Sequence, residues 1–417
     1  GNAGTSARYN CPHDEAGLSS WDDPDTWSGG VIPGADEDVT LPSGTKVLLV
    51  HSPGHQFGLV TIPASSELII GENFSDGITL DLGGMLIAGA LRAGAETCRL
   101  DSPVTITLHG QRPSSKTERD SLPVHFKGIV VTGSLDLHGK RYHQTWTRLA
   151  YPVSPGQSVL LLQDPVNWEP GQQVLLTTTA IKDSRDFNRN EVLTLSATTL
   201  QAPVGVGAAL HVTTTAKYSH GALDAWQGEV ALLSRTIKVQ GAPDDSEPTD
   251  VVPRDCQGIA NHLGSTTAPC PDSYLTGFGG HILVTGEARV SGVELYRMGQ
   301  TNQLGRYPLH FHVLGNAAGR AYMRDSSVHR SFYRCVSIHG TNFANVSQNV
   351  AFDIIGHCYY LEDGAEEYNT FEYNLAAHVH FIGLPGAVTT DGQFCDDVHQ
   401  SDDLLLPADV AAAGFYI

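Results

Sequence analysis

The segments CVSIHGT (residues 335–341) and CYYLEDG (residues 358–364) are two copies of one short pattern, offset by 23 residues. Asn349 and Asn374 recur at matching points of the turns that follow, before VAF and LAA. A period near 23 residues with asparagine-containing corners is typical of a parallel β-helix, in which each repeat forms one coil with apolar residues inside and polar residues outside. The sequence therefore predicts such a helix in this part of the chain.

The pattern extends upstream to a pair of histidines. LHFH (309–312) aligns with VSIH (336–339) across a slightly longer turn. Successive coils of a β-helix stack at the strand spacing of about 4.8 Å. We therefore expect His312, His339 and Glu362 to form a ladder on one outer face.

Four histidines are candidate metal ligands on this face. Residues i and i+2 of a strand share a face with Cα atoms about 6.5 Å apart, so His310 and His312 can converge on one ion or sugar. His339 and His357 come from the coils that follow, and imidazoles with a carboxylate are a common metal-binding set. The alternative interpretation is a ladder of stacked polar residues that hydrogen-bond for stability.

Glu362 and Asp363 are candidate catalytic carboxylates, with His339 as an acid or base. Glycoside hydrolysis uses two carboxyls, about 5–5.5 Å apart for retention or about 6.5–9.5 Å apart for inversion. Adjacent strand residues point to opposite faces, so these two can flank one bond only if the strand ends there. Glu366 and Glu367 are alternative partners, and a solvated turn is the alternative interpretation.

Arg306, Arg334 and Asp353 are candidate substrate-binding residues. An arginine beside the cluster can neutralise the carboxylate of a uronate sugar through paired hydrogen bonds. Each arginine can equally form an ordinary surface ion pair, and Asp353 is also an alternative second carboxylate.

The chain has seven cysteines. We expect Cys11 to pair with Cys98, and Cys256 with Cys270 inside an acidic, proline-rich loop (241–273), because a loop of this length needs a covalent link. Cys335 and Cys358 stack one coil apart, where bridging geometry is seldom good, so they are expected to be buried thiols. Cys395 is left over.

Two sequons, NFS at Asn73 and NVS at Asn345, predict N-glycosylation. With the cysteines they favour an oxidising, extracellular setting for a secreted protein or an ectodomain. The sequence contains no run of about 18 apolar residues, so it predicts no membrane span. No signal peptide opens the chain, and it ends on the apolar run AAAGFYI, so we expect the natural protein to continue beyond residue 417.

Charge limits the partners. The 417 residues carry a net charge of −20, which argues against nucleic acid because phosphate binding needs a basic surface. An acidic polymer would need a local basic patch or a bound cation to offset the same field.

The rest of the chain predicts further β-structure. Residues 1–19 are a polar lead-in, and from Trp21 short strands of Val, Ile and Leu alternate with Gly, Pro and Asp turns, as in all-β folds. QRPSSKTERDSLPVH (111–125) is expected to be a surface loop. VNWEPGQQVLLTTTA (166–180) starts a second set of strands.

These motifs resemble a known group. FGGHILV, VELYRMGQ, GRYPLHFHV, SVHRSFYRCVSIHGTN and GHCYYLEDGAEEYNTFEYNL are similar to the cell-surface hyaluronidase group, which includes the cell migration-inducing hyaluronan-binding protein and the fibrocystins. The glycine-rich block at 20–150, with Trp21 and Trp27, resembles that group's eight-glycine domain. The resemblance implies an all-β chain in which this domain caps a right-handed parallel β-helix (151–417).

The resemblance also implies a function. An extracellular, metal-assisted hydrolase of hyaluronan or a related glycosaminoglycan is expected, with Ca²⁺ as the ion by resemblance, or Zn²⁺ or another transition metal if the histidines bind it. Hyaluronan-degrading members carry a large inserted domain after TWTRL, whereas here the chain runs on to VNWEPGQQ. That difference favours the alternative of a non-catalytic, fibrocystin-type module that binds glycans or proteins. A polysaccharide lyase is the further alternative.

Overall fold

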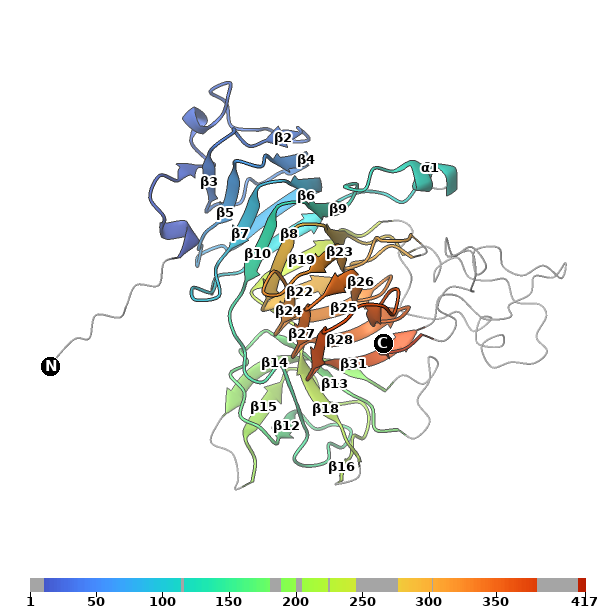
Figure 1. The fold of residues 1–417 in the computed structure, drawn as a ribbon. Helices are drawn as coiled ribbons and strands as arrows, with labels where there is room; N and C mark the ends of the chain where they lie inside the picture. The colour runs from blue at the N-terminus through green and yellow to red at the C-terminus, as the bar shows by residue number, and fades with distance from the viewer. Residues whose placement is uncertain are drawn as a thin grey trace.

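The structure, a computed structural model, is an elongated parallel β-helix with a smaller antiparallel sheet packed beside it (Figure 1). Helices in the described part are short: η1 (Pro12–Asp14), η2 (Pro24–Thr26) and α1 (Lys116–Ser121). The predictions of an all-β fold and of a parallel β-helix are therefore confirmed. The structure describes residues 11–113, 116–180, 189–199, 205–223, 226–244, 277–301, 303–380 and 412–417.

One face of the helix is a nine-stranded parallel sheet. Each coil contributes one short strand to it, and equivalent residues of successive coils lie opposite each other, as Leu135 does with Ala288. In spatial order its strands are β1 (Ser19–Ser20), β3 (Lys46–Leu49), β5 (Glu67–Ile70), β7 (Ala90–Ala93), β10 (Ser134–His138), β21 (Glu287–Ser291), β24 (Ala321–Arg324), β27 (Asn345–Ser347) and β30 (Thr370–Glu372).

The other two faces are joined by the long strand β6 (Ile78–Ile87), which pairs with one neighbour through its first half and with another through its second half. One face then runs through β8 (Val104–Leu108), β19 (Ile237–Gly241), β22 (Val293–Tyr296), β25 (Ser327–Ser331), β28 (Val350–Ile355) and β31 (Leu375–His380). The third face, which carries the candidate site, consists of β2 (Val39–Thr40), β4 (Gln56–Ile62), β9 (Gly128–Val131), β20 (His281–Val284), β23 (Leu309–Asn316), β26 (Val336–Asn342), β29 (Tyr359–Leu361) and β32 (Phe415–Tyr416).

A single apolar core fills the helix from Trp21 to Leu361. The strands of block 20–150 stack directly under later coils, with β9 on β20 and β10 on β21. This block is therefore the first part of the same helix and shares its core, whereas the sequence predicted a separate capping domain.

Stacked glycines and asparagines explain two corners of the coils. A Cβ on Gly133 would lie 2.0 Å from the carbonyl oxygen of Gly89, and one on Gly286 would lie 2.2 Å from that of Gly133, so only glycine fits where these turns touch. At another corner the Asn349 side chain donates to the Asn374 side chain at 3.0 Å, which confirms the expected asparagine pair.

Residues 146–232 form an antiparallel unit with its own core. Its strands, in the order β11-β18-β13-β14-β15-β12, are β11 (Trp146–Arg148), β18 (Glu229–Leu232), β13 (Gln173–Leu176), β14 (Glu191–Thr199), β15 (Ala208–Val212) and β12 (Val159–Leu162); β16 (Ala222–Leu223) and β17 (Trp226–Gln227) make a hairpin. The parallel helix thus resumes at β19, not at residue 151 as expected. Local hairpins pair these strands with one another, so they cannot continue the coil.

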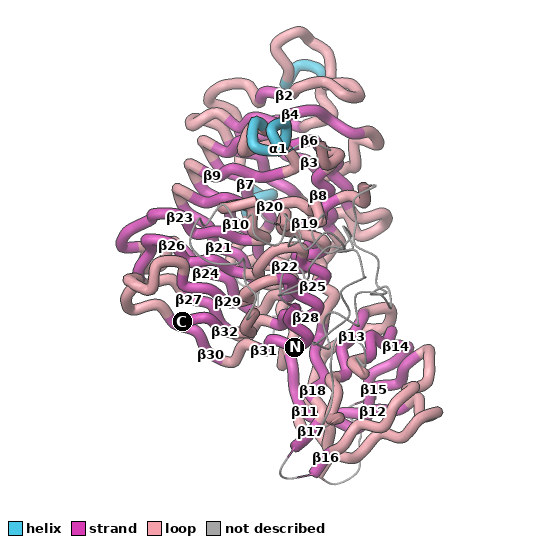
Figure 2. Tube along the Cα trace, turned by 90° about the vertical axis from the view of Figure 1, so that its right-hand side faces the viewer, coloured by secondary structure: helices cyan, strands magenta, loops and turns pink. Residues whose placement is uncertain are grey.

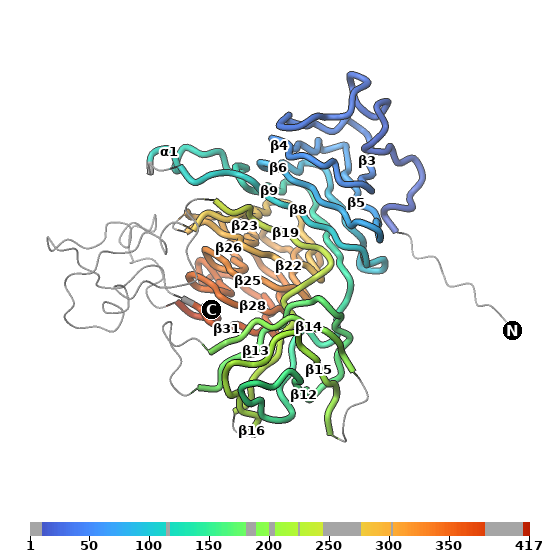
Figure 3. The backbone as a smooth tube through the Cα atoms, turned by 180° about the vertical axis from the view of Figure 1, so that it is seen from behind, coloured from blue at the N-terminus to red at the C-terminus, as the bar shows by residue number. Residues whose placement is uncertain are grey.

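The antiparallel unit packs against the last coils of the helix (Figures 2 and 3). Leu175 and Ala231 from its sheet share an apolar cluster with Val350 of β28. The Trp146 ring nitrogen donates to the Tyr373 carbonyl at 2.9 Å. The contact fixes this unit on the face next to β28, away from the strand β23.

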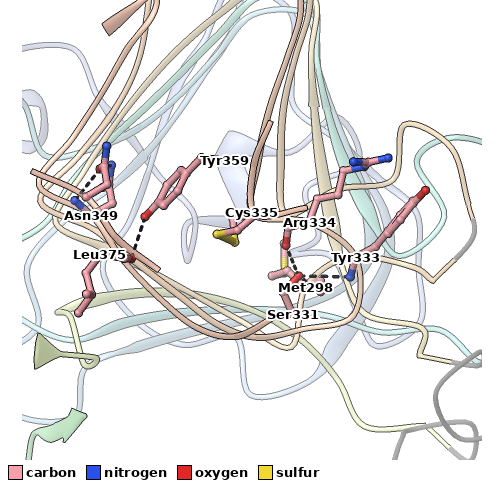
Figure 4. The surroundings of a disulfide bond; sticks show 10 residues. Met298, Ser331, Tyr333, Arg334, Cys335, Asn349, Tyr359 and Leu375 are labelled. Carbon is pink, nitrogen blue, oxygen red and sulfur yellow. Dashed lines mark hydrogen bonds between the residues drawn. A yellow bond between two sulfur atoms is a disulfide. The ribbon is translucent and has the colours of Figure 1, made fainter. Parts of the chain in front are cut away.

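The cysteines confirm one expectation and correct another. Cys11 and Cys98 form the predicted disulfide. Cys335 and Cys358 also form a disulfide and are not the free thiols expected, because their Cα atoms lie 4.5 Å apart, inside the bridging range. Figure 4 shows Cys335 inside the coil, and both residues are fully buried. The pair Cys256–Cys270, like Cys395, lies outside the described residues.

Candidate functional site

The strand register brings three histidines and one glutamate together on the outer face of β23 and β26. Leu309 and Phe311 of β23 point into the core, so His310 and His312 point outward. His312 lies opposite His339, and because Ile338 lies opposite Leu361, Glu362 follows one coil further on. The predicted ladder of His312, His339 and Glu362 is therefore present, and His310 adjoins it.

The backbone changes direction just after both ladder histidines. Val313 has φ 56°, and Gly340, which follows His339, has φ 54°. The pairing of β23 with β26 shifts register here and resumes at Gly315. A β-branched residue in the left-handed region is rare and costs free energy, so the packing of the two coils enforces this turn directly beside the site.

The polar atoms of the cluster lie within direct reach of one another. The Nδ1 atoms of His312 and His339 are 3.0 Å apart. Glu362 Oε2 lies 3.4 Å from His310 Nε2 and 4.0 Å from His339 Nδ1. The rings of His310 and His339 are parallel, with centroids 5.9 Å apart.

Asp363 contacts the same imidazole from its other side. Its Oδ2 lies 3.1 Å from His339 Nε2. β29 ends at Leu361, so Glu362 and Asp363 lie in the turn and both approach His339. This is the exception that the sequence left open for two adjacent carboxylates.

Glu362 is held in its ionised form. Burial alone would raise its pKa, but His310, the Ser337 hydroxyl and the charge of Arg334 together lower the pKa to about 2. Ser337 donates to Oε2 at 2.8 Å and Tyr307 donates to Oε1 at 3.0 Å. A carboxylate in this state can accept a proton or bind a cation, but it cannot serve as a proton donor near neutral pH.

His310 and His312 differ in their surroundings. His310 is 2% exposed, and its Nδ1 lies 3.1 Å from the Gly305 carbonyl oxygen. Its buried Nε2 makes no hydrogen bond of good geometry with the described residues. His312 is half-buried, and burial followed by the neighbouring imidazoles of His310 and His339 lowers its pKa.

The cluster forms one end of a pocket of about 510 Å³, a size typical of small-molecule sites. The opposite wall is the loop between β8 and β9, which includes α1 and belongs to the block at 20–150. Arg119 and Asp120 of this loop line the pocket with Leu122 and Val124. Figure 1 shows α1 projecting from the helix on the side of β9.

Arg306 holds this loop in place. Its guanidinium donates to the carbonyl oxygens of Leu122 at 2.9 Å and of Pro123 at 3.3 Å, and to Gln300 Oε1 at 3.2 Å. Arg306 also lines the pocket, so it lies near the histidine cluster as the sequence predicted. These contacts support a positioning role.

Arg334 is almost fully buried. Its guanidinium carbon lies 3.7 Å from the Tyr360 ring centroid, 4.9 Å from that of Tyr333 and 5.3 Å from that of Tyr307. Its charge acts on Glu362 from beneath the site, and it does not line the pocket.

The structure separates His357 and Asp353 from the cluster. The His357 ring stacks on Tyr360 and contacts the tilted ring of Tyr416, and its Nδ1 accepts from the Ala413 amide at 3.2 Å. Asp353 lies on β28, which belongs to another face of the helix from β23 and β26. The expected contributions of these two residues to a shared site therefore do not fit the geometry.

The sequence interpretation missed Arg119 and Asp120, because it treated 111–125 only as a surface loop. Tyr307 and Ser337, which hold Glu362, lie inside the motifs GRYPLHFHV and CVSIHGT, so the spacing of these motifs could have identified them. Both asparagines of the predicted sequons lie within the described residues. The Asn73 side-chain amide donates to the Val50 carbonyl oxygen, and the Asn345 side-chain oxygen accepts from the Arg324 guanidinium. Their glycosylation stays a prediction.

Family descriptions match both ends of the chain. The G8 domain matches residues 26–150 and the CEMIP beta-helix matches residues 277–417. Among solved structures, the tailspike gp61 of Pseudomonas phage phi297 aligns with 78% of this chain and 57% of its own, at 9% identity and a TM-score of 0.21. None of the helices in the described residues has the length and apolar character needed to cross a bilayer.

Curated relatives match nearly the whole chain. Protein rliB of Dictyostelium discoideum is 40% identical over 414 residues, which are 98% of this chain and 33% of that protein. Fibrocystin-L of Homo sapiens is 31% identical over 402 residues, covering 87% of this chain and 9% of that protein. The chain thus spans a third or less of these relatives. A G8 domain followed by a CEMIP beta-helix, together with these relatives, places the chain in the CEMIP and fibrocystin group that its sequence resembles.

Proposed function

We propose that the chain is the catalytic part of an extracellular, metal-assisted hydrolase that cleaves hyaluronan or a related acidic polysaccharide. The observation that carries this proposal is the convergence of an ionised, mostly buried Glu362 with three imidazoles at one end of a pocket of about 510 Å³. The two disulfides and the fibrocystin-type relatives support an extracellular location.

Glu362 is the general base in this proposal. Its low pKa keeps it ionised, and its bonds from Tyr307 and Ser337 fix its direction, so it can take the proton of an attacking water. His339, held by Asp363, orients the site beside Glu362, and the leaving sugar oxygen takes its proton from water in the pocket. A divalent ion bound beside them would supply positive charge and acidify water.

Arg119 is the proposed binding group for the substrate carboxylate. Arg119 lines the pocket on the wall that faces the cluster, and one of its guanidinium nitrogens donates to the Pro113 carbonyl oxygen at 3.1 Å. A guanidinium pairs with a carboxylate through parallel hydrogen bonds. One such group would let a chain of net charge −20 accept an acidic polymer.

The test is to incubate the protein with hyaluronan, with and without EDTA, and to follow polymer length by gel electrophoresis. Wild type should shorten the polymer, EDTA should stop it, and Glu362→Gln should lose the activity. Glu372→Gln, on another face of the helix, is the matched control and should retain it. Intact hyaluronan, chondroitin and heparan chains in every condition would refute the proposal.

Arg119→Gln should raise KM for hyaluronan more than it lowers kcat, and Arg119→Lys should recover part of the loss. The effect should shrink on a neutral oligosaccharide, because the interaction requires a substrate charge. An equal loss on charged and neutral substrates would contradict this role.

A lyase is distinguished by product absorbance from the unsaturated sugar. Tyr307 is a poor candidate for its base, because burial raises the Tyr307 pKa well above its ordinary value. The remaining alternative, a non-catalytic module that binds glycans or proteins, draws on the similarity to fibrocystin-L. Calorimetric binding of oligosaccharide without turnover, unchanged in Glu362→Gln, would select it.

A further inference from the structure

We infer that His310, His312 and His339 bind one transition-metal ion of the zinc class, with a coordination position open towards the pocket. The inference names the ion class at the site of the proposed function, but it depends on the geometry of the side chains and not on hydrolysis. Their ligand nitrogens lie within 4.8 Å of one another.

The spacing of these atoms fits a single ion. Zinc–nitrogen bonds of about 2.0–2.1 Å in a tetrahedral site place two ligand nitrogens about 3.4 Å apart. The Nδ1 atoms of His312 and His339 are 3.0 Å apart, close to that value. Glu362 Oε2 lies 3.4 Å from His310 Nε2, so a carboxylate stands directly beside the same point.

The outer partners of two imidazoles fix which nitrogen faces the ion. His310 Nδ1 lies 3.1 Å from the Gly305 carbonyl oxygen, which can only accept, so Nδ1 carries the proton and Nε2 offers its lone pair. His339 Nε2 lies 3.1 Å from the carboxylate of Asp363, which leaves Nδ1 for the ion. A carbonyl or carboxylate behind each ligating imidazole is the usual outer shell of a metal site.

A second observation points to a missing partner. His310 is 2% exposed, and its Nε2 has no hydrogen bond of good geometry among the described residues. Buried polar atoms in proteins are almost always satisfied. An ion bound by this atom and by the two Nδ1 atoms would satisfy it. In a metal-free site, a proton shared between His312 and His339 would account for their contact but would leave His310 Nε2 with only the 3.4 Å approach of Glu362 Oε2.

The donor set selects the class of ion. Imidazole nitrogens suit Zn²⁺ and its transition-metal neighbours. Ca²⁺ takes six to eight oxygen ligands in proteins, and the nearest carboxylates here are Glu362 and Asp363, of which Asp363 is directed to His339. The ion at this cluster is therefore not the Ca²⁺ that the family resemblance suggested.

The experiment uses the untagged chain, stripped with chelator and then titrated with Zn²⁺ in the presence of excess Ca²⁺. We expect one equivalent of zinc by elemental analysis, retained through dialysis and not displaced by calcium. Co²⁺ in place of zinc should give the visible absorption of a four- or five-coordinate nitrogen site. Calcium bound in place of zinc, or no bound metal at all, would overturn the inference.

Matched variants locate the ion. His312→Gln and His339→Gln should each lower zinc affinity more than 100-fold, beyond the roughly 10- to 100-fold typical of an outer partner. His51→Gln, an exposed histidine paired with Asp22, should bind zinc as wild type does. Half-buried His312 is the variant least prone to misfold, and a thermal melt checks each protein. Unchanged zinc affinity in folded His312→Gln and His339→Gln would exclude this site.

The outcomes separate the two proposals. Zinc bound by these histidines with no cleavage of any polysaccharide would leave the inference standing and remove the hydrolase. Cleavage by a protein that binds no zinc at these histidines would remove the inference and leave the hydrolase standing.

Discussion

Asp363 lies on the opposite side of the His339 ring from His312, with its Oδ2 3.1 Å from Nε2. The carboxylate therefore sets both the orientation and the protonated nitrogen of a residue central to the candidate site. Asp363 itself is more than half exposed, so it contributes little to the core.

The Asp363→Asn substitution should accordingly weaken the site without unfolding the protein. An amide can accept the same hydrogen bond but carries no charge, so zinc affinity should fall by about 10- to 100-fold, as for other outer partners of metal ligands. Competition with a zinc-binding dye measures the change. A thermal melt should show stability close to wild type. A large stability loss with unchanged zinc affinity would assign Asp363 to the fold and not to the site.

The disulfide between Cys335 and Cys358 gives a second prediction. It joins two adjacent coils beside the candidate site with a sequence separation of 23 residues. The double variant Cys335→Ala, Cys358→Ala should lose about 2–4 kcal/mol of unfolding free energy, the typical contribution of a bridge that closes a loop of this size. Denaturant unfolding measures the loss, and the Cys11→Ala, Cys98→Ala pair provides a comparison at the other end of the helix.

Thiol titration distinguishes the bridge from stacked free thiols. In unreduced, denatured wild type, neither Cys335 nor Cys358 should react with a thiol reagent, as peptide mapping can show. Labelling of both residues under these conditions would restore the thiol interpretation.

The repeat predicted the ladder correctly because equivalent positions of neighbouring coils must lie opposite each other once the period is known. The same logic placed Asn349 over Asn374. It could not place the loop with Arg119, which precedes β9, two strands before β23 on the same face. This loop reaches the site through the contacts of Arg306 and not through the repeat. The sequence placed His357 beside the cluster, but His357 lies in the turn between β28 and β29. A turn, unlike a strand, does not fix the direction of a side chain.

Two other differences between the sequence predictions and the structure arise from long-range packing. Residues 146–232 carry strands as short and apolar as those of the helix, and only their hairpin pairing distinguishes an antiparallel sheet from further coils. The block at 20–150 has its own glycine pattern, yet its core is continuous with the later coils because its strands have the same three faces.

His138 makes the stability of the protein dependent on pH. Burial, followed by the charge of Arg99, lowers its pKa to about 4 from an ordinary value of 6.5. The unfolded chain therefore binds a proton that the folded protein excludes between these values, and stability falls as pH drops from 6.5 towards 4. His138→Gln, which can still bond to the Tyr322 hydroxyl 2.8 Å from Nε2, should flatten this fall by roughly 1.4 kcal/mol per pH unit. Urea unfolding at pH 7 and pH 4.5 measures it, and an unchanged pH slope would contradict the assignment.

Arg306 is the residue whose loss should separate loop positioning from metal binding. It donates to the carbonyl oxygens of Leu122 and Pro123 in the wall of the pocket but lies outside the three-histidine set. Arg306→Gln should therefore speed hydrogen exchange in residues 116–126 and raise KM for the polysaccharide, while zinc affinity stays within about twofold of wild type. Arg289→Gln, which removes ion pairs to Asp136 and Glu287 on another face, should change neither quantity. Loss of zinc binding with an unchanged hydrogen-exchange rate in residues 116–126 would show that Arg306 acts on the imidazoles and not by positioning the loop.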